Sequence, residues 1–279
     1  MKVYSPSATL SFQQCPQRWL WERQGWRPKA VGRPTVAASI GIGISKGMEL
    51  LFKSSTVGAA VDGAIEIAYK EVNERIEAGG YLAPDAEKGL EEMPRRIEKA
   101  IKGFVKQRPF PEDWHTFVTE VTFPDHGHSR PDLLCQSDLG PCIVDYKSKV
   151  TAQDYIIDRF LQDMEKSWQM YHYIWAARAM GLQVESFAVC LIIIEPLHFY
   201  LEQWVVDEEH MARWVLDAHR WWAQMEKIDQ DGLTPARVGE HRNQYGLCPQ
   251  YGMCFDTPEV ASTNYYKRER HETPQLISN

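Results

Sequence analysis

The sequence predicts an α/β fold in which helices flank a mixed β-sheet and an N-terminal helical region precedes the sheet. Three observations support this prediction. Residues 1–110 carry helical periodicity, the segments that follow are rich in β-branched and aromatic residues, and one strong helical segment divides those strands into two groups. Helices, three strands, a helix and two further strands are typical of a mixed sheet with helices on its faces.

The chain has 279 residues, which allows two domains at about 150 residues per domain. It contains no internal repeat and no linker long enough to separate two units, so we expect a single domain. Within residues 1–279 we expect a helical region (1–110), an α/β core (111–230), a cysteine-containing segment (231–260) and a polar tail (261–279).

Composition excludes several classes of protein. Hydrophobic residues make up 44% and charged residues 25% of the chain, which excludes a collagen, a disordered tail and a disulfide-stapled miniprotein. Lys plus Arg minus Asp plus Glu is 31 − 38 = −7, which argues against a protein that coats nucleic acid by bulk charge. The longest apolar run, 187–194, is shorter than a membrane span, and the start shows no signal peptide, so we expect a cytoplasmic protein without a membrane partner.

The helices and strands follow from periodicity and from glycine or proline punctuation. Helices are predicted at 7–24, 38–52, 57–79, 85–107, 155–180 and 208–229. Strands are predicted at 115–123, 129–136, 142–147, 187–194 and 199–206. The turn sequence from Ser137 to Gly140 makes the second and third strands an antiparallel hairpin, and Pro196-Leu197 turns the last two strands.

Ionic residues converge across the first hairpin. Arg130-Pro131-Asp132 enters its first strand and Asp145-Tyr146-Lys147 lies on its second. Because strand side chains alternate between faces, Asp145 and Lys147 share a side that Asp132 can also reach. Two carboxylates can hold a hard divalent cation while the lysine positions a water and offsets charge on phosphorus, which indicates phosphodiester hydrolysis. The alternative is a cross-strand ion pair on an exposed sheet.

A second pattern lies near the N-terminus, where cations alternate with tryptophans. Arg18, Arg23 and Trp26 are its main members, and cations beside flat aromatic faces suit a phosphate backbone with unstacked bases. The alternative is a helix with a tryptophan-rich core face and solvated arginines. Lys149, beyond the Asp-Tyr-Lys strand, is similarly either a phosphate contact or a solvated strand end.

Gln169 and Tyr173 lie four residues apart on the helix after the Asp-Tyr-Lys strand and therefore share a face. The order Pro-Asp, Asp-x-Lys, Gln-x-x-x-Tyr resembles the PD-(D/E)XK nuclease superfamily, in the branch of RecB-like exonucleases. The serine-rich turn from Ser5 that leads a helix bearing Cys15-Pro16 is also similar to the start of that branch.

This resemblance implies a restriction-endonuclease-like sheet core. It also implies that Asp132 and Asp145 bind Mg²⁺ or Mn²⁺, that Lys147 assists the hydrolytic water, and that Gln169 and Tyr173 hold the lysine or the DNA backbone. The residues alone support the first three roles, but for Gln169 and Tyr173 they support only proximity.

The sequence departs from the branch at two places. Ser45 stands where the branch carries a metal-binding histidine in Gly-x-x-x-His. Of the four cysteines that clamp an iron-sulfur cluster, Cys15, Cys248 and Cys254 match, whereas Tyr245 replaces the fourth, so a four-thiolate [4Fe-4S] cluster cannot form from this pattern. His241 completing a mixed iron-sulfur or zinc site, and three thiols packed as small hydrophobes, both stay open.

Taken together, the sequence indicates a metal-dependent DNA nuclease, with exonucleolytic action on single-stranded ends in recombination, repair or phage replication, and with a recombination or replication protein as a partner. The alternative is a catalytically weakened nuclease-fold protein that serves as a nucleic-acid-binding or assembly subunit. A hydrolase of a smaller phosphate ester is a third hypothesis. The sequence has no glycine-rich phosphate loop that would indicate triphosphate hydrolysis.

Overall fold

A computed structural model of the chain describes residues 2–119, 121–127, 129–231, 242–243, 246–247 and 265–267. Its centre is a five-stranded sheet in the order β4-β5-β6-β7-β8. The strands are β4 (His115–Thr119), β5 (Leu133–Ser137), β6 (Gly140–Lys149), β7 (Ser186–Ile193) and β8 (His198–Val205). Within this five-stranded sheet β6 and β7 are parallel and the other neighbouring strands are antiparallel, which confirms the predicted mixed sheet and the β5/β6 hairpin.

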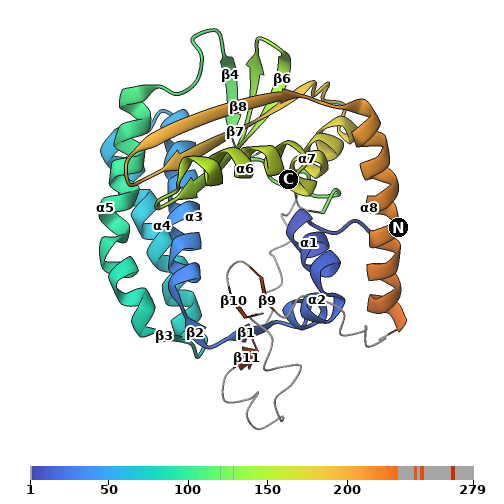
Figure 1. Cartoon of the computed structure of the whole chain (residues 1–279), viewed down its shortest axis with the longest axis horizontal. Helices are drawn as coiled ribbons and strands as arrows, with labels where there is room; N and C mark the ends of the chain where they lie inside the picture. The colour runs from blue at the N-terminus through green and yellow to red at the C-terminus, as the bar shows by residue number, and fades with distance from the viewer. Residues whose placement is uncertain are drawn as a thin grey trace, which may run out of the picture.

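Two groups of helices cover the two faces of the sheet (Figure 1). One face packs against α3 (Arg33–Phe52), α4 (Val57–Glu77) and α5 (Pro84–Gln107). The other packs against α6 (Asp154–Glu165), α7 (Trp168–Ala179) and α8 (Glu208–Asp231), and α1 (Pro6–Gln14), with α2 (Pro16–Arg23) beside it, packs onto α7 and α8. Short strand pairs lie outside the sheet: β1 (Trp26–Pro28) with β11 (Tyr265–Lys267), β2 (Ala30–Val31) with β3 (Tyr81–Leu82), and β9 (Arg242–Asn243) with β10 (Gly246–Leu247).

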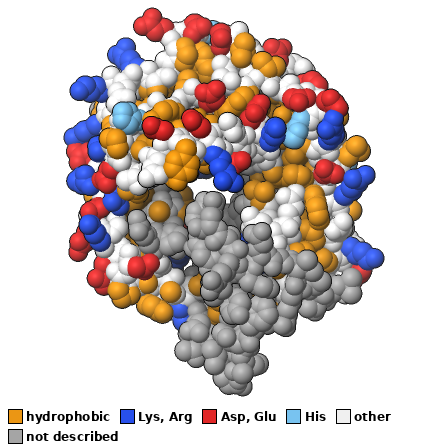
Figure 2. All heavy atoms as spheres, viewed as in Figure 1, with side chains coloured by type: hydrophobic (Ala, Val, Ile, Leu, Met, Phe, Trp, Pro, Cys, Tyr) orange, Lys and Arg blue, Asp and Glu red, His pale blue; other side chains and the backbone are white. Residues whose placement is uncertain are grey.

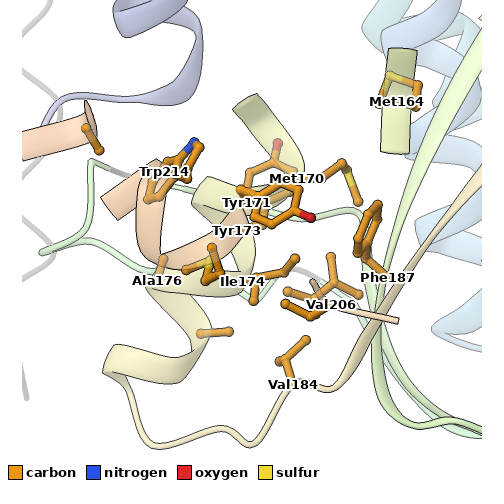
Figure 3. Packing of buried hydrophobic residues seen from close by; sticks show 14 of the residues in the cluster. Met164, Met170, Tyr171, Tyr173, Ile174, Ala176, Val184, Phe187, Val206 and Trp214 are labelled. Atoms are coloured by element: carbon orange, nitrogen blue, oxygen red, sulfur yellow. The ribbon is translucent and has the colours of Figure 1, made fainter. Parts of the chain in front are cut away.

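Strand alternation sorts the core into these two layers. On β6, Val144 and Tyr146 pack toward α3, α4 and α5, whereas Ile143 packs toward α7. All residues of β7 are buried, as expected for a strand covered on both faces, and Figure 3 shows Phe187 among the α7 side chains. Cys135, Cys142 and Cys190 lie on strands of the sheet and are buried as small core side chains.

Two predicted helices are each divided in the structure. The helix predicted at 7–24 is α1 and α2, because Cys15 is extended (φ −162°, ψ 107°) and a residue before proline is excluded from helical geometry. The helix predicted at 155–180 is α6 and α7, since Ser167 is also extended (φ −64°, ψ 126°). The break lets α7 bury most of its surface, whereas α6 buries mainly Ile157 and Met164.

Among the described residues, α3 is the one helix that is long and apolar enough to cross a membrane, although Lys46 and Glu49 interrupt its apolar run. Its window Thr35–Phe52 has a mean hydropathy of 1.3, sufficient by length and composition alone. In the structure α3 packs against α4, α5 and β6 as a core helix. The apolar composition of this helix is therefore explained by burial within the protein.

Close packing of α3 on α4 depends on Gly43. A Cβ added there would lie 2.7 Å from the carbonyl oxygen of Ala64 on α4. That oxygen belongs to a helix backbone and cannot move without displacing α4. The glycine therefore sets the separation between the two helices.

We expect Gly43→Ala to lower the free energy of unfolding by about 1–3 kcal/mol, since overpacking outweighs the helix propensity that alanine adds. The matched control is Gly58→Ala in α4, where a Cβ meets nothing within 4 Å. That control is expected to be neutral or stabilising by up to about 1 kcal/mol. Equal stabilisation of both variants in urea denaturation would contradict this account.

A buried histidine makes the fold sensitive to acid. His172 on α7 is 0% exposed, its Nε2 lies 3.0 Å from the carbonyl oxygen of His126, and its ring meets Trp175, Trp214 and Trp222. Burial lowers the pKa of His172 to about 4. The folded protein therefore holds this ring neutral where an unfolded chain would protonate it.

Because the folded pKa is depressed, stability is retained above the unfolded pKa of about 6.5 and falls as the pH drops toward 4. We expect the titration of His172 to lower the free energy of unfolding by about 3 kcal/mol between these two pH values. His172→Gln cannot ionise and should show a flatter pH dependence in denaturant titrations. An unchanged slope in the variant would exclude His172 as the source.

Candidate active site

A cleft of about 710 Å³ opens where β6 extends past the end of β5, between α3, α4 and α7. It brings together all five residues predicted as the catalytic set. These are Asp132, Asp145, Lys147, Gln169 and Tyr173. They come from the segment before β5, from β6 and from α7, so the cleft is assembled from chain segments that lie far apart in the sequence.

The end of the β5/β6 ladder exposes this part of β6. The register pairs Leu133 with Val144, and its continuation would place Pro131 opposite Tyr146. Proline has no N–H to donate to a ladder. Instead, the backbone N–H of Tyr146 donates to Asp132 Oδ2 at 2.8 Å. The carboxylate of Asp132 is thereby fixed at the point where the two strands separate.

A chain of polar contacts links β6 to α7. Lys147 Nζ lies 2.7 Å from Asp145 Oδ2 and donates to Gln169 Oε1 at 3.0 Å. Gln169 Nε2 in turn donates to the hydroxyl oxygen of Tyr173 at 2.6 Å. Lys147 is therefore held from both sides, and the hydrogen of the Tyr173 hydroxyl remains to be donated.

Burial and neighbouring charges shift the pKa values of Asp132 and Lys147. Burial raises the pKa of Asp132 to about 7, with the negative charge of Asp145 as the second cause, while the Tyr146 N–H, Lys147 and Arg130 act in the opposite direction. Burial alone would lower the pKa of Lys147, but attraction to Asp145 and Asp132 outweighs it and raises that pKa. The lysine is thus held as an ammonium.

The donor set fits a hard divalent cation. Asp145 is 3% exposed, and its Oδ2 contacts the ammonium but accepts no well-oriented hydrogen bond. No group of three His, Cys, Asp or Glu able to hold a metal occurs within the described ranges. Mg²⁺ is commonly held by one or two carboxylates with water and substrate phosphates, which matches Asp132 and Asp145 as the available ligands.

α3 contributes Ser45, which the sequence singled out, and two residues to which it gave no role. Ser45 lines the cleft, as do Lys46 and Glu49. Glu49 Oε1 is 2.6 Å from Lys46 Nζ and 3.2 Å from Lys53 Nζ, so two ammonium groups balance its charge. The helical spacing of Gly41, Ser45 and Glu49 is the signal that indicates this face. It did not reveal the role of Lys46.

The predicted nucleic-acid-binding residues do not line the cleft. Arg18 pairs with Glu22 at 2.8 Å, and Arg23 pairs with Asp229 and lies over the Tyr4 ring. Trp26 lies in β1. Lys149 Nζ is 4.3 Å from the centre of the Phe160 ring. DNA binding by Arg18, Arg23, Trp26 and Lys149 stays a prediction.

Of the three predicted cluster cysteines, the structure describes only Cys15. Its thiol forms no disulfide with another cysteine in the described part of the chain, and its sulfur accepts from the N–H of Arg18 at 3.5 Å as the N-cap of α2. Cys248 and Cys254 lie outside the described residues, as do Tyr245 and His241. An iron-sulfur or zinc site at these positions therefore stays a prediction.

Comparison with models of protein families identifies a match. The family model described as "PD-(D/E)XK nuclease superfamily" matches residues 3–254, a span that includes the whole cleft and most of the chain. A search of curated proteins finds no significant match.

The charges in the cleft predict how Asp132→Asn changes the stability of the fold. Asparagine keeps an acceptor for the Tyr146 N–H but removes the cost of burying a charged carboxylate and, second, the repulsion from Asp145. Since the folded pKa of Asp132 is raised, its ionisation destabilises the fold increasingly as the pH rises from about 4 to 7. In EDTA at pH 8 we expect Asp132→Asn to be more stable than the wild type, with a free energy of unfolding that is larger by on the order of 1–2 kcal/mol.

Asp132→Ala serves as the comparison, because it also removes the repulsion but leaves the Tyr146 N–H without its acceptor. That loss is worth about 1–3 kcal/mol, so the alanine variant should be less stable than the asparagine variant. An asparagine variant well below wild-type stability would show that the two carboxylates do not repel each other in the folded protein.

Proposed function

The chain belongs to the PD-(D/E)XK nuclease superfamily, and on this premise we propose that it is a Mg²⁺- or Mn²⁺-dependent deoxyribonuclease. Membership indicates nuclease activity and therefore phosphodiester hydrolysis. DNA as the substrate, exonucleolytic action on single-stranded ends, and a role in recombination, repair or phage replication are the parts that we add. The observation that carries the proposal is the contact chain from Asp145 through Lys147 and Gln169 to Tyr173 in one cleft.

Asp132 and Asp145 would hold the cation, which supplies Lewis-acid stabilisation of the phosphate and lowers the pKa of bound water. Lys147 presents a fixed positive charge beside both carboxylates. In that position it can orient a water by donating to it and can offset the negative charge that develops on the phosphoryl oxygens. Its orientation is maintained by Gln169 rather than left to a flexible four-carbon stem.

Tyr173 contributes as a donor. Burial, followed by the charge of Asp145, raises the pKa of its hydroxyl well above the usual value, so the group stays protonated. Because the hydroxyl oxygen already accepts from Gln169, its hydrogen can be directed to a phosphate oxygen. This arrangement supports the role of Gln169 and Tyr173 in positioning the lysine and the backbone.

The acidic total charge is compatible with a nucleic-acid substrate. Figure 2 shows that, on the face of the molecule seen in that view, acidic and basic side chains of the described residues are interspersed and not separated by sign. On a surface of mixed charge, nearby basic side chains can guide the strand, while the excess of acids keeps the protein soluble. We place the protein in the cytoplasm, where a reducing environment maintains its free thiols, with a recombination or replication protein as its partner.

A second candidate is a nuclease-fold subunit that binds nucleic acid with weak or no hydrolysis. The observation that favours it is Ser45, whose hydroxyl lines the cleft where relatives carry a metal-binding histidine. Because two lysines neutralise the Glu49 carboxylate, α3 contributes little to binding a cation. Retention of both aspartates and the lysine favours the active enzyme.

The test is cleavage of end-labelled single-stranded, duplex and circular single-stranded DNA with Mg²⁺, Mn²⁺ or EDTA. We expect metal-dependent cleavage of linear single strands that Asp145→Asn and Lys147→Ala each reduce by about a thousandfold or more, since each removes charge from the reacting centre. The controls are Asp138→Asn in the exposed hairpin turn and Lys102→Ala on α5, which should cleave normally.

The DNA substrates and the metal conditions distinguish the nuclease from the binding subunit. Cleavage of the circle would rule out a purely exonucleolytic enzyme and leave the nuclease intact. Tight binding without cleavage under every metal condition would favour the binding subunit. Undiminished cleavage by both site variants would remove these residues from the mechanism.

A further inference from the structure

A second hollow of about 860 Å³ lies at the far end of α3, where α3, α5 and the edge strand β4 meet. We call it the aromatic groove, because five aromatic residues line it. Its rings are Phe52 on α3, Phe104 on α5, Phe110 and Trp114 in the loop between α5 and β4, and Phe117 on β4. This groove is separate from the residues that line the candidate active site.

Three of the rings are arranged as a shallow stack. Phe110 lies 5.5 Å from Trp114 with an interplanar angle of 16°, and 5.6 Å from Phe117 with an angle of 29°. Phe110 and Phe117 are only half-buried, so ring surface faces the groove. The indole Nε1 of Trp114, a residue that is 4% exposed, has no hydrogen-bond acceptor within the described part of the chain.

The groove and the cleft are separate hollows that share α3 as a wall. Ser45 lines the cleft and Phe52 lines the groove, seven residues or nearly two helical turns apart, which places them on the same stripe of the helix. The rise between them is about 10 Å, roughly three times the 3.4 Å rise per nucleotide of a stacked strand. A strand with its phosphate in the cleft can therefore bring a nearby base to the groove.

We propose that the aromatic groove binds an unstacked nucleobase of the strand that occupies the cleft. This inference rests on the proposed function and names its substrate class as single-stranded nucleic acid. Stacking on aromatic rings accepts any base, because every base has a π-face. Arg108 lines the groove and can meet the adjoining phosphate, while Glu112 lines it with the opposite charge, so ring contact rather than net charge carries the recognition.

The experiment is a two-by-two comparison of base and ring. Equilibrium binding is measured by fluorescence anisotropy in EDTA, with a labelled ten-nucleotide thymidine strand and with an abasic strand of the same length that keeps the sugar and phosphate. Wild type is compared with Phe117→Leu, which retains apolar volume but loses the flat face. The control is Val118→Ala, the next residue on β4, which is 45% exposed and does not line the groove.

We expect wild type to bind the thymidine strand about tenfold more tightly than the abasic strand, Phe117→Leu to reduce that ratio at least threefold, and Val118→Ala to leave it unchanged. If thermal unfolding shows that Phe117→Leu is poorly folded, Phe110→Leu in the loop makes the same test. A ratio that is the same in wild type and in the folded ring variant overturns the inference. A groove that serves a protein partner would give that result.

Cleavage of the thymidine strand with Mg²⁺ is measured in parallel. A changed binding ratio without any cleavage would support the base site while contradicting the proposed nuclease. Cleavage with an unchanged ratio would support the nuclease while contradicting the base site. Absence of binding to either strand by wild type would contradict the base site directly.

Discussion

The buried contact between Asp145 and Lys147, with Asp132 beside them, is the constraint on which the site depends. Removing one charge from water in a protein interior costs several kcal/mol unless an opposite charge and hydrogen bonds compensate. Here Asp145 contacts the ammonium and Asp132 attracts it through its charge. The Tyr146 N–H donates to Asp132, and Gln169 accepts from the lysine. The end of the β5 ladder and the position of α7 both follow from supplying these partners.

Much of this arrangement could be predicted from local rules. Period-two alternation placed Asp145 and Lys147 on one side of a strand, and a turn sequence at Ser137 to Gly140 fixed the hairpin that brings Asp132 close. The order of helices and strands indicated the mixed sheet with its two helical layers. These features depend on residues close in sequence or on a single pairing, for which patterns are informative.

Other features depend on tertiary contacts that carry little sequence signal. The break at Ser167 appears only because α7 must bury nearly its whole surface while α6 remains amphipathic. The pairing of Lys46 and Lys53 with Glu49 on the cleft wall follows from the way α3 packs, and helical spacing alone does not distinguish it from a solvated face. Arg23, expected to contact nucleic acid, is engaged with Asp229 on α8, a partner 206 positions away that no local pattern indicates.

Gly41 on α3 lets the helix approach the strand that bears the ionic side chains. A Cβ there would stand 3.2 Å from Ser148 Oγ on β6, and both residues line the cleft. The spacing of the cleft walls therefore depends in part on a residue that carries no charge. A larger side chain at this position would press on Ser148 and narrow the cleft while every ionic side chain stayed in place.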